Sequence, residues 1–447
     1  MTESFERLWA DLAAMGKDPE TGGYHRGGWT PTEREATGWF VDQCAARGLA
    51  LESDGLGNLV GWWEPAAPGE TAPGKSAAGE ARRTGGTPAQ GEVPAAPGGT
   101  GGGGLAAGRA VGGEVRSVPG VVTGSHLDSV IDGGAFDGPL GVVSALAAVD
   151  RLRAEGFTPS VPIGVGAFVE EEGSRFGMPC LGSRIATGVL AADKALALRD
   201  RGGVSLAEAL SAAGTDPAGV GPSPLLERMG TFVELHVEQG RALAAPVGVA
   251  SSIWPHGRFR FTFQGEANHA GTTLMEDRHD PMLTYAMTAL AANKQARLAG
   301  ARATFGRLAV EPNGTNAVPS QVTAWLDARA ATDDVLQSLL AAITRLATER
   351  AERDGTSVSV VAESVSPIVD FQPGLRDRLA AVLDGAPVLP TGAGHDAGVF
   401  SDAGIPTAML FVRNPTGVSH SPAEYAEMDD CLAGVEALAT VLKDLAR

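Results

Sequence analysis

Residues 117–156 read SVPGVVTGSHLDSVIDGGAFDGPLGVVSALAAVDRLRAEG and predict a buried strand, a glycine-rich loop and a helix, in that order. The strand is the apolar run that ends near His126, and Pro139 suits the first turn of the helix. Asp137 therefore stands just before a helix N-terminus. Apolar residues then recur at helical spacing, at Val142, Val143, Leu146, Val149 and Leu152.

A second apolar run, VPIGVGAFVEEEG at residues 161–173, also ends in polar side chains. Short apolar strands that alternate with longer helical segments are typical of an α/β domain. Ligands bind at the carboxyl ends of the strands in open α/β sheets. We therefore expect an α/β fold whose functional residues follow these strands.

The pattern changes near residue 250. GRFRFTFQG at 257–265 and QVTAWLDARA at 321–330 alternate strictly between apolar and polar residues, and a helical stretch follows each of them. This succession predicts a smaller α+β domain over residues 250–366, inserted into the larger domain. The larger domain then comprises residues 1–249 and 367–447.

Residues 64–113 are rich in Gly, Pro, Ala, Ser and Thr and include GGTGGGG from Gly98 to Gly104. Such a segment buries too little apolar surface to offset the entropy of ordering it. We expect a disordered insertion on the surface of the larger domain.

Composition excludes several classes of protein. The formal net charge is -18, and the chain has no basic cluster, so we expect no nucleic-acid partner. No apolar run reaches the roughly 20 residues needed to span a bilayer, and the N-terminus lacks a signal-peptide pattern. We expect no membrane association and a cytoplasmic protein. Cys44, Cys180 and Cys431 are scattered and are expected to be reduced thiols.

The loop after the first strand carries His126, Asp128, Asp132 and Asp137. Histidine and carboxylates gathered at a strand end favour a divalent metal site. The alternative for Asp137 is that it only caps the following helix.

Glu170, Glu171 and Glu172 stand in a row where the second strand ends. Three adjacent carboxylates repel one another, and a nearby cation would relieve that repulsion. The alternative is a solvated acidic turn.

Two further segments carry histidines. His236 lies in an alternating segment between Glu234 and Glu238, and His420 lies in a polar loop after the last strand, near Glu424. Taken singly, His236 could be a core residue and His420 an exposed loop residue. Together with the two strand ends, they supply what a two-metal hydrolase needs, because two metals can share a bridging carboxylate and a bridging water.

These motifs resemble the M20 family of metal-dependent amidohydrolases and peptidases. The similar branch contains allantoate amidohydrolases, N-carbamoyl-L-amino acid hydrolases and β-ureidopropionases. The motifs run in one order from Gly124 to Glu424: GSHLDS, GGAFDGPLGV, EEEGSRFG, ELHVEQG, NHAGTT, EPNGTNAVP, GAGHDAG and HSPAE. The resemblance implies a two-metal catalytic domain with an inserted lid and dimerisation domain.

The resemblance also implies a set of roles. Asp137 would bridge two divalent metals, for which His and carboxylate ligands suit Zn or Mn alike. Asp128 would orient the imidazole of His126. Anchoring the acidic triplet on the following GSRF makes Glu171 the general base and Glu172 a ligand, whereas a shift by one residue would make Glu170 the base and Glu171 the ligand. The implied ligands are His126, Asp137, Glu172, His236 and His420.

In the lid, the resemblance places His269 to stabilise the oxyanion in the partner subunit of a homodimer. Asn316 and Arg329 match the pair that holds the substrate carboxylate, a task that suits a guanidinium. Gln239 and His395 are further candidates for substrate contact.

The predicted function is metal-dependent hydrolysis of the ureido C–N bond of allantoate, which releases ammonia and carbon dioxide. N-carbamoyl-L-amino acids are the alternative substrates. An M20 aminoacylase or dipeptidase, which would not need Asn316 and Arg329, is a more distant possibility. A noncatalytic dimeric binding protein is disfavoured because every ligand position and the base position are filled.

Overall fold

The computed structural model describes residues 2–66 and 118–447. Of the expected insertion, residues 67–113 lie outside the described residues. Glu64, at its start, is described and forms an ion pair with Arg228. Within the described ranges, no helix combines the length and the apolar character needed to cross a membrane.

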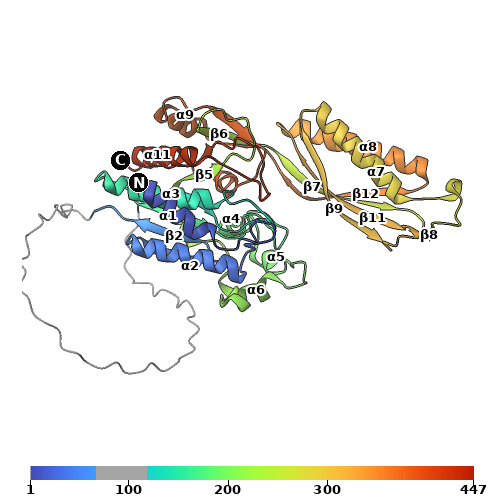
Figure 1. Cartoon of the computed structure of the whole chain (residues 1–447), viewed down its shortest axis with the longest axis horizontal. Helices are drawn as coiled ribbons and strands as arrows, with labels where there is room; N and C mark the ends of the chain where they lie inside the picture. The colour runs from blue at the N-terminus through green and yellow to red at the C-terminus, as the bar shows by residue number, and fades with distance from the viewer. Residues whose placement is uncertain (1, 67–117) are drawn as a thin grey trace, which may run out of the picture.

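A large mixed sheet forms the centre of the larger part of the molecule (Figure 1). Its four central strands, in the order β4-β3-β5-β15, are parallel to one another. Antiparallel strands flank them, and β14 (Val388–Thr391) pairs with β6. The full order is β1 (Ala50–Ser53), β2 (Leu59–Trp63), β4 (Ile163–Phe168), β3 (Gly120–His126), β5 (Met229–Val237), β15 (Thr407–Val412), β6 (Val247–Ile253) and β13 (Val369–Asp370).

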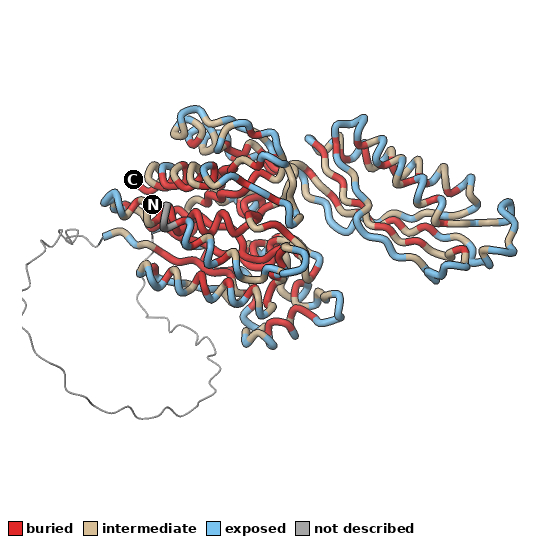
Figure 2. The backbone as a smooth tube through the Cα atoms, viewed as in Figure 1, coloured by how far each residue is buried: buried red, intermediate tan, exposed pale blue. Residues whose placement is uncertain are grey.

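Helices cover both faces of this sheet, because the central strands carry apolar side chains on both faces. Val121 belongs to one buried cluster and the next residue, Val122, to the other; Val233 and Phe232 divide in the same way. Figure 2 shows buried residues concentrated in this part. Helices that pack here are α1 (Thr2–Ala13), α2 (Pro31–Ala46), α3 (Pro139–Ala154), α9 (Pro373–Val382), α10 (Asp396–Asp402) and α11 (Met428–Leu445). A smaller cluster holds α4 (Leu181–Ala186), α5 (Ala192–Leu196) and α6 (Leu206–Ala213).

A second, four-stranded antiparallel sheet lies beside the larger part, on the right in Figure 1. Its order is β12 (Ser357–Ser366), β7 (His256–Gln264), β11 (Gln321–Arg329) and β9 (Arg302–Glu311). Helices α7 (Pro281–Leu298) and α8 (Asp333–Asp354) cover one face, where Phe259, Phe261 and Phe263 are buried. This unit was expected from residue 250, but β6 keeps the chain in the large sheet as far as Ile253. We call the four-stranded sheet with its two helices the lid.

The mixed α/β class with an inserted α+β unit is as the sequence predicts. The helix predicted at the end of the stretch 117–156 is α3, which begins at Pro139. The strictly alternating stretch at 257–265 is β7, whose residues alternate between buried and partly exposed. In β5, by contrast, the residues around His236 are all buried, because a central parallel strand is covered on both faces.

Phe400 offers a test of the core beneath the sheet. Its ring centroid lies 4.9 Å from those of both Phe168 and Phe232. We expect Phe400→Ala to lower the free energy of unfolding by about 3–5 kcal/mol, because it leaves a cavity in a close-packed cluster. Chemical denaturation measures the loss. Val361→Ala, on an exposed position of β12, is the control and should change stability by less than about 0.5 kcal/mol; equal effects would contradict this account.

Candidate metal centre

The predicted ligands gather at the carboxyl ends of the central strands. β3 ends at His126, which pairs in register with Phe168, the last residue of β4. The acidic triplet follows that residue directly. His236 lies near the end of β5, beside Phe411 of β15. Parallel pairing of neighbouring strands therefore brings segments more than 100 residues apart in sequence to one edge of the sheet.

Asp137 stands at the centre of this group. Its Oδ1 atom lies 3.1 Å from Nε2 of His236 and 3.7 Å from Nε2 of His126. Its Oδ2 atom lies 3.3 Å from Nε2 of His420, and that nitrogen is 3.5 Å from Oε2 of Glu172. One carboxylate thus faces two groups of metal-ligating atoms: His126, Asp137 and His236, and Asp137, Glu172 and His420.

The position of Asp137 is held from several sides. Gly138 follows it with a φ of 85°, and an added Cβ there would lie 2.4 Å from the His126 ring. Glu424 accepts hydrogen bonds at 3.0 Å from the backbone N–H groups of Phe136 and Asp137. The amide of Gln239 donates to Oδ2 of Asp137 at 2.8 Å. The glycine lets the imidazole approach, and the two side chains fix the loop and the carboxylate.

The acidic triplet is also tied to the first loop. Oδ1 and Oδ2 of Asp128 accept hydrogen bonds from the backbone N–H groups of Glu171 and Glu172, both at 3.1 Å. Nδ1 of His126 lies 3.1 Å from the backbone oxygen of Asp128 and 3.5 Å from its carboxylate. Asp128 therefore contacts His126, as the resemblance implied, and in addition positions the triplet.

The three glutamates occupy different places. Oε2 of Glu172 belongs to the group with His420, and Oε2 of Glu171 lies 3.7 Å from Nε2 of His126. The thiol of Cys180 donates to the other oxygen of Glu171 at 3.3 Å. The carboxylate of Glu170 points away from both groups and accepts backbone N–H groups instead.

Unpaired ligand atoms show that this site suits a metal. Nε2 of His126, Nε2 of His236 and Oε1 of Glu172 are buried without a hydrogen-bond partner among the described residues. Although Nε2 of His236 is 3.1 Å from Asp137, the contact does not have the direction of a hydrogen bond. Such separations suit two ligands of one ion, and buried polar atoms otherwise have partners. Imidazole and carboxylate together match Zn or Mn.

The charge balance supports the same conclusion. Within residues 2–66 and 118–447, none of the buried carboxylates around the site forms an ion pair with a lysine or arginine side chain. Buried anions require a compensating cation or a proton. These carboxylates are Asp128, Asp137, Glu170, Glu171, Glu172, Glu234, Asp396 and Glu424.

When no metal is bound, protons compensate for the buried negative charge. Burial, with the nearby Asp137 charge, raises the pKa of Glu172 and of Glu424 to about 7. Burial also raises the pKa of Glu171 well above its usual value. Burial opposes protonation of His420, but the contacts with Asp137 and Glu172 outweigh it and raise its pKa to about 9.

His395 precedes α10 and lies against the site. Its ring centroid is 4.4 Å from that of His236, and burial, followed by the charge of His236, holds its pKa well below the usual value. Glu234, which lies in the same group of side chains as His236 and His395, accepts hydrogen bonds from the Ser125 hydroxyl and the Ala397 N–H. A neutral imidazole at this place can donate a hydrogen bond to a bound molecule.

The lid residues do not join this cluster within one chain. His269 lies in the short strand β8 (Asn268–His269), which pairs with β10 (Ala317–Val318), directly after Asn316. β8 lies at the end of the lid away from the large sheet (Figure 1). Arg329 is at the opposite end of β11, where it donates to the backbone oxygen of Gly392 at 2.7 Å.

Several positions differ from what the sequence suggested. Asp132, expected at the strand end with the ligands, is half-buried and hydrogen-bonds to Thr21 and His25. Glu424 and Glu170 hold the site's loops, roles that residue type and spacing did not reveal. The only signal for Glu424 was its place in the HSPAE motif.

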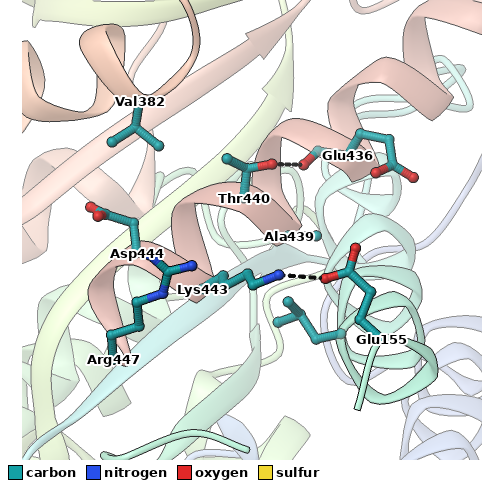
Figure 3. A pocket seen from close by; sticks show the side chains of 9 residues that line it. Glu155, Val382, Glu436, Ala439, Thr440, Lys443, Asp444 and Arg447 are labelled. Atoms are coloured by element: carbon teal, nitrogen blue, oxygen red, sulfur yellow. Dashed lines mark hydrogen bonds and ion pairs between the residues drawn. The ribbon is translucent and has the colours of Figure 1, made fainter. Parts of the chain in front are cut away.

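A hollow of about 400 Å³ lies on another part of the larger unit, between α3 and α11 (Figure 3). Several of the charged side chains that line it already form ion pairs: Lys443 with Glu155 at 2.7 Å and Asp444 with Arg378 at 2.8 Å. None of the metal-ligating residues lines it. The site is therefore marked by its donor atoms rather than by the size of a cavity.

The fold, the donor set and the family and relatives described next define a metal-dependent hydrolase that acts on C–N bonds. The chain belongs to peptidase family M20/M25/M40, whose model matches residues 122–444. It is 34% identical to an N-carbamoyl-L-amino acid amidohydrolase of Geobacillus stearothermophilus, over 99% of this chain and 98% of that protein. It is 31% identical to an allantoate amidohydrolase of Escherichia coli, with the same coverage of each.

A solved structure has the same fold. It is an amidase of the hydantoinase/carbamoylase family from Burkholderia vietnamiensis, with a TM-score of 0.81 and 26% identity. The match covers 99% of this chain and 97% of that chain. The likeness thus extends over the large sheet and the lid alike.

Removal of the metal should make the thermal stability of the protein depend on pH. We expect the metal-stripped protein to lose thermal stability as the pH rises from about 5 to 9. The folded-state pKa values of Glu170, Glu172, Asp396 and Glu424 are near 7 and that of His420 is near 9. Each lies above its unfolded value, so the folded state binds protons more tightly and loses that advantage as they dissociate.

Thermal unfolding at pH 6 and pH 8.5, before and after adding Zn²⁺ or Mn²⁺, tests this expectation. Metal should restore stability chiefly at the higher pH, where the ligands are deprotonated. A metal-stripped protein that is at least as stable at pH 8.5 as at pH 6 would count against it.

Proposed function

We propose that this protein hydrolyses the ureido C–N bond of allantoate with two divalent metal ions, Zn or Mn. The observation that carries the proposal is the shared carboxylate of Asp137, which faces one group of ligands through each oxygen, with Glu171 beside His126. Two metals held in this way polarise a carbonyl group and lower the pKa of a bound water. A ureido group offers such a carbonyl between two nitrogens.

Glu171 is the general base of the proposed reaction. Its carboxylate takes a proton from the attacking water while the new C–O bond forms at the ureido carbon. It then returns the proton to the leaving nitrogen as the C–N bond breaks. The two products are the amine that carries the leaving nitrogen and carbamic acid, and the carbamic acid decomposes to ammonia and carbon dioxide.

His269 is suited to stabilise the oxyanion. Its Nδ1 atom accepts hydrogen bonds from the backbone N–H groups of Gly271 at 3.0 Å and Thr272 at 3.2 Å. Because Nδ1 is an acceptor, the ring proton lies on Nε2, which is then the donor. A hydrogen bond from Nε2 to the developing O⁻ stabilises the transition state.

Arg329 is suited to hold the substrate carboxylate. Asp327 binds its guanidinium through two hydrogen bonds, at 2.8 and 3.1 Å, and Gly392 accepts a third. Two of the five N–H groups of the guanidinium remain for a ligand. The planar group is thereby oriented before a substrate arrives.

We infer a homodimer from where these lid residues lie. Asn316 precedes β11 and Arg329 is its last residue, and the nine residues of the strand span on the order of 30 Å. They can hold one carboxylate together only if Asn316 comes from a partner subunit, and His269 lies beside Asn316. The lid also offers an edge strand, β9, and exposed apolar side chains on α7, Leu283, Met287 and Leu290, for such an interface.

N-carbamoyl-L-amino acids are the second candidate substrates. The relative named for that activity is 34% identical to this chain and the relative named for allantoate is 31% identical. Both substrate classes present a ureido group beside a carboxylate. We further propose a cytoplasmic location, supported by the three cysteines, which are buried free thiols.

The first prediction from this proposal concerns turnover. Metal-reconstituted protein should release ammonia from allantoate faster than from a series of N-carbamoyl-L-amino acids. Glu171→Gln should lower kcat by about 10²–10⁴-fold, since it removes the general base. Arg329→Ala should raise KM for these acids.

Faster turnover of the carbamoyl amino acids would retain the mechanism and replace the substrate, whereas preference for allantoate would indicate a role in purine catabolism. Unchanged activity of Arg329→Ala would favour an aminoacylase or dipeptidase. Bound metal without turnover of any ureido or acyl substrate would favour a binding protein.

The second prediction concerns the partner subunit. His269→Ala and Glu171→Gln should each be inactive as homodimers. After mixing and reassociation, half the dimers carry one subunit of each kind, and one of their two sites has both residues intact. Activity should therefore recover to about a quarter of the wild-type value. Recovery that stays at the level of the separate variants would show that His269 does not act across the dimer.

A further inference from the structure

We propose that Glu170 is a positioning residue that ties the metal-ligating loop to the N-terminal segment of the chain. Glu170 is fully buried and is the first of the three adjacent glutamates. Its φ of 53° lies in the left-handed region, which turns its side chain away from those of Glu171 and Glu172. The inference rests on the proposed roles of those two residues.

Within the described part of the chain, the Glu170 carboxylate forms its hydrogen bonds with backbone N–H groups. Oε1 accepts from Arg175 at 2.9 Å and from Phe176 at 3.0 Å, and Oε2 accepts from Gly28 at 2.9 Å. Two of these donors belong to the loop that follows the triplet, and the third belongs to the N-terminal segment. A carboxylate can accept all three, whereas an amide would set its own N–H groups against at least one of them.

Gly28 allows the close approach on the other side. A Cβ atom at this position would lie 2.4 Å from Oε2 of Glu170. The link also runs in the reverse direction, because the guanidinium of Arg175 donates to the backbone oxygen of Gly28 at 2.7 Å. The loop and the segment are thus joined by two hydrogen bonds of opposite direction.

The same segment holds the other ligand-bearing loop. The backbone N–H of Arg26 donates to the Ser129 hydroxyl at 3.0 Å, and the Ser129 N–H donates to the oxygen of Arg26 at 3.1 Å. The backbone N–H of Tyr24 donates to the backbone oxygen of Gly133 at 3.1 Å. Residues 24–28 therefore bind both the loop that leads to Asp137 and the loop that carries Glu172, and together with the Asp128 carboxylate they fix the separation between the two.

Loss of this link should affect the group of candidate metal ligands whose members come from both loops. Glu172 and Asp137 come from different loops and share the group with His420, whereas His126 and His236 are held by the strands β3 and β5. Loss of the tie at Glu170 should weaken metal binding by Asp137, Glu172 and His420 more than by His126, Asp137 and His236.

The test is a titration of the metal-stripped protein with Co²⁺, followed by visible absorption. In Glu170→Gln, one Co²⁺ should bind with wild-type affinity and the other about 10–100-fold more weakly, as for other residues that orient metal ligands. Gly28→Ala, which presses on the same carboxylate from the other side, should have the same selective effect. Both variants should unfold cooperatively.

Glu33→Gln is the matched control. Glu33 is also a buried carboxylate in the N-terminal region, but it bonds to Trp29 and Thr37 and to neither metal-ligating loop. It should leave both affinities within about twofold of wild type. Equal weakening of both sites in Glu170→Gln, or no weakening of either, would overturn the proposal. The titration measures metal binding and not activity. If the wild type failed to hydrolyse ureido compounds, the proposed function would be refuted, but the role of Glu170 could still be decided from the titration.

Discussion

The fold buries several carboxylates at one edge of the sheet, and the repulsion between their negative charges is the constraint that the rest of the site must satisfy. Asp137 lies within 3.7 Å of three imidazole nitrogens, and Glu172 stands beside one of them. Hydrophobic packing on both faces of the sheet fixes the strand ends and therefore holds these charges close together. The arrangement is stable only with protons or cations among them. The same packing that builds the fold thus creates its affinity for metal.

Much of the fold was predictable because its signals are local. Apolar runs that end in glycine or acidic residues mark the parallel strands, and Pro139 marks the start of α3. The limits of the prediction lie where pairing is long-range. β6 extends to Ile253 because it pairs with β13 and β14, which come more than 100 residues later, and no periodicity near residue 250 records that pairing.

The cluster of candidate ligands was predictable from residue types and motif order, but the contacts of the residues around it were not. In an extended strand Glu170 and Glu172 would point to the same side. The left-handed backbone at Glu170 breaks that alternation, so that identical adjacent residues receive different tasks. Likewise, Glu424 acts on backbone N–H groups about 290 residues away, at Phe136 and Asp137. Sequence spacing carries no record of either contact.

The proposed roles of two lid residues, Asn316 and Arg329, impose a constraint that a single chain cannot satisfy. An extended strand separates Asn316 from Arg329, so the thirteen-residue spacing itself implies that the two cannot meet around one small carboxylate. Under the proposed dimer, the substrate would lie where three segments converge: the metal-ligating loops, the base of the same subunit's lid and the far end of the partner's lid. Metal binding would then need one chain, whereas recognition of an acid would need two. In the proposed dimer this division follows from strand geometry, because the length of β11 would place its two ends at different active sites.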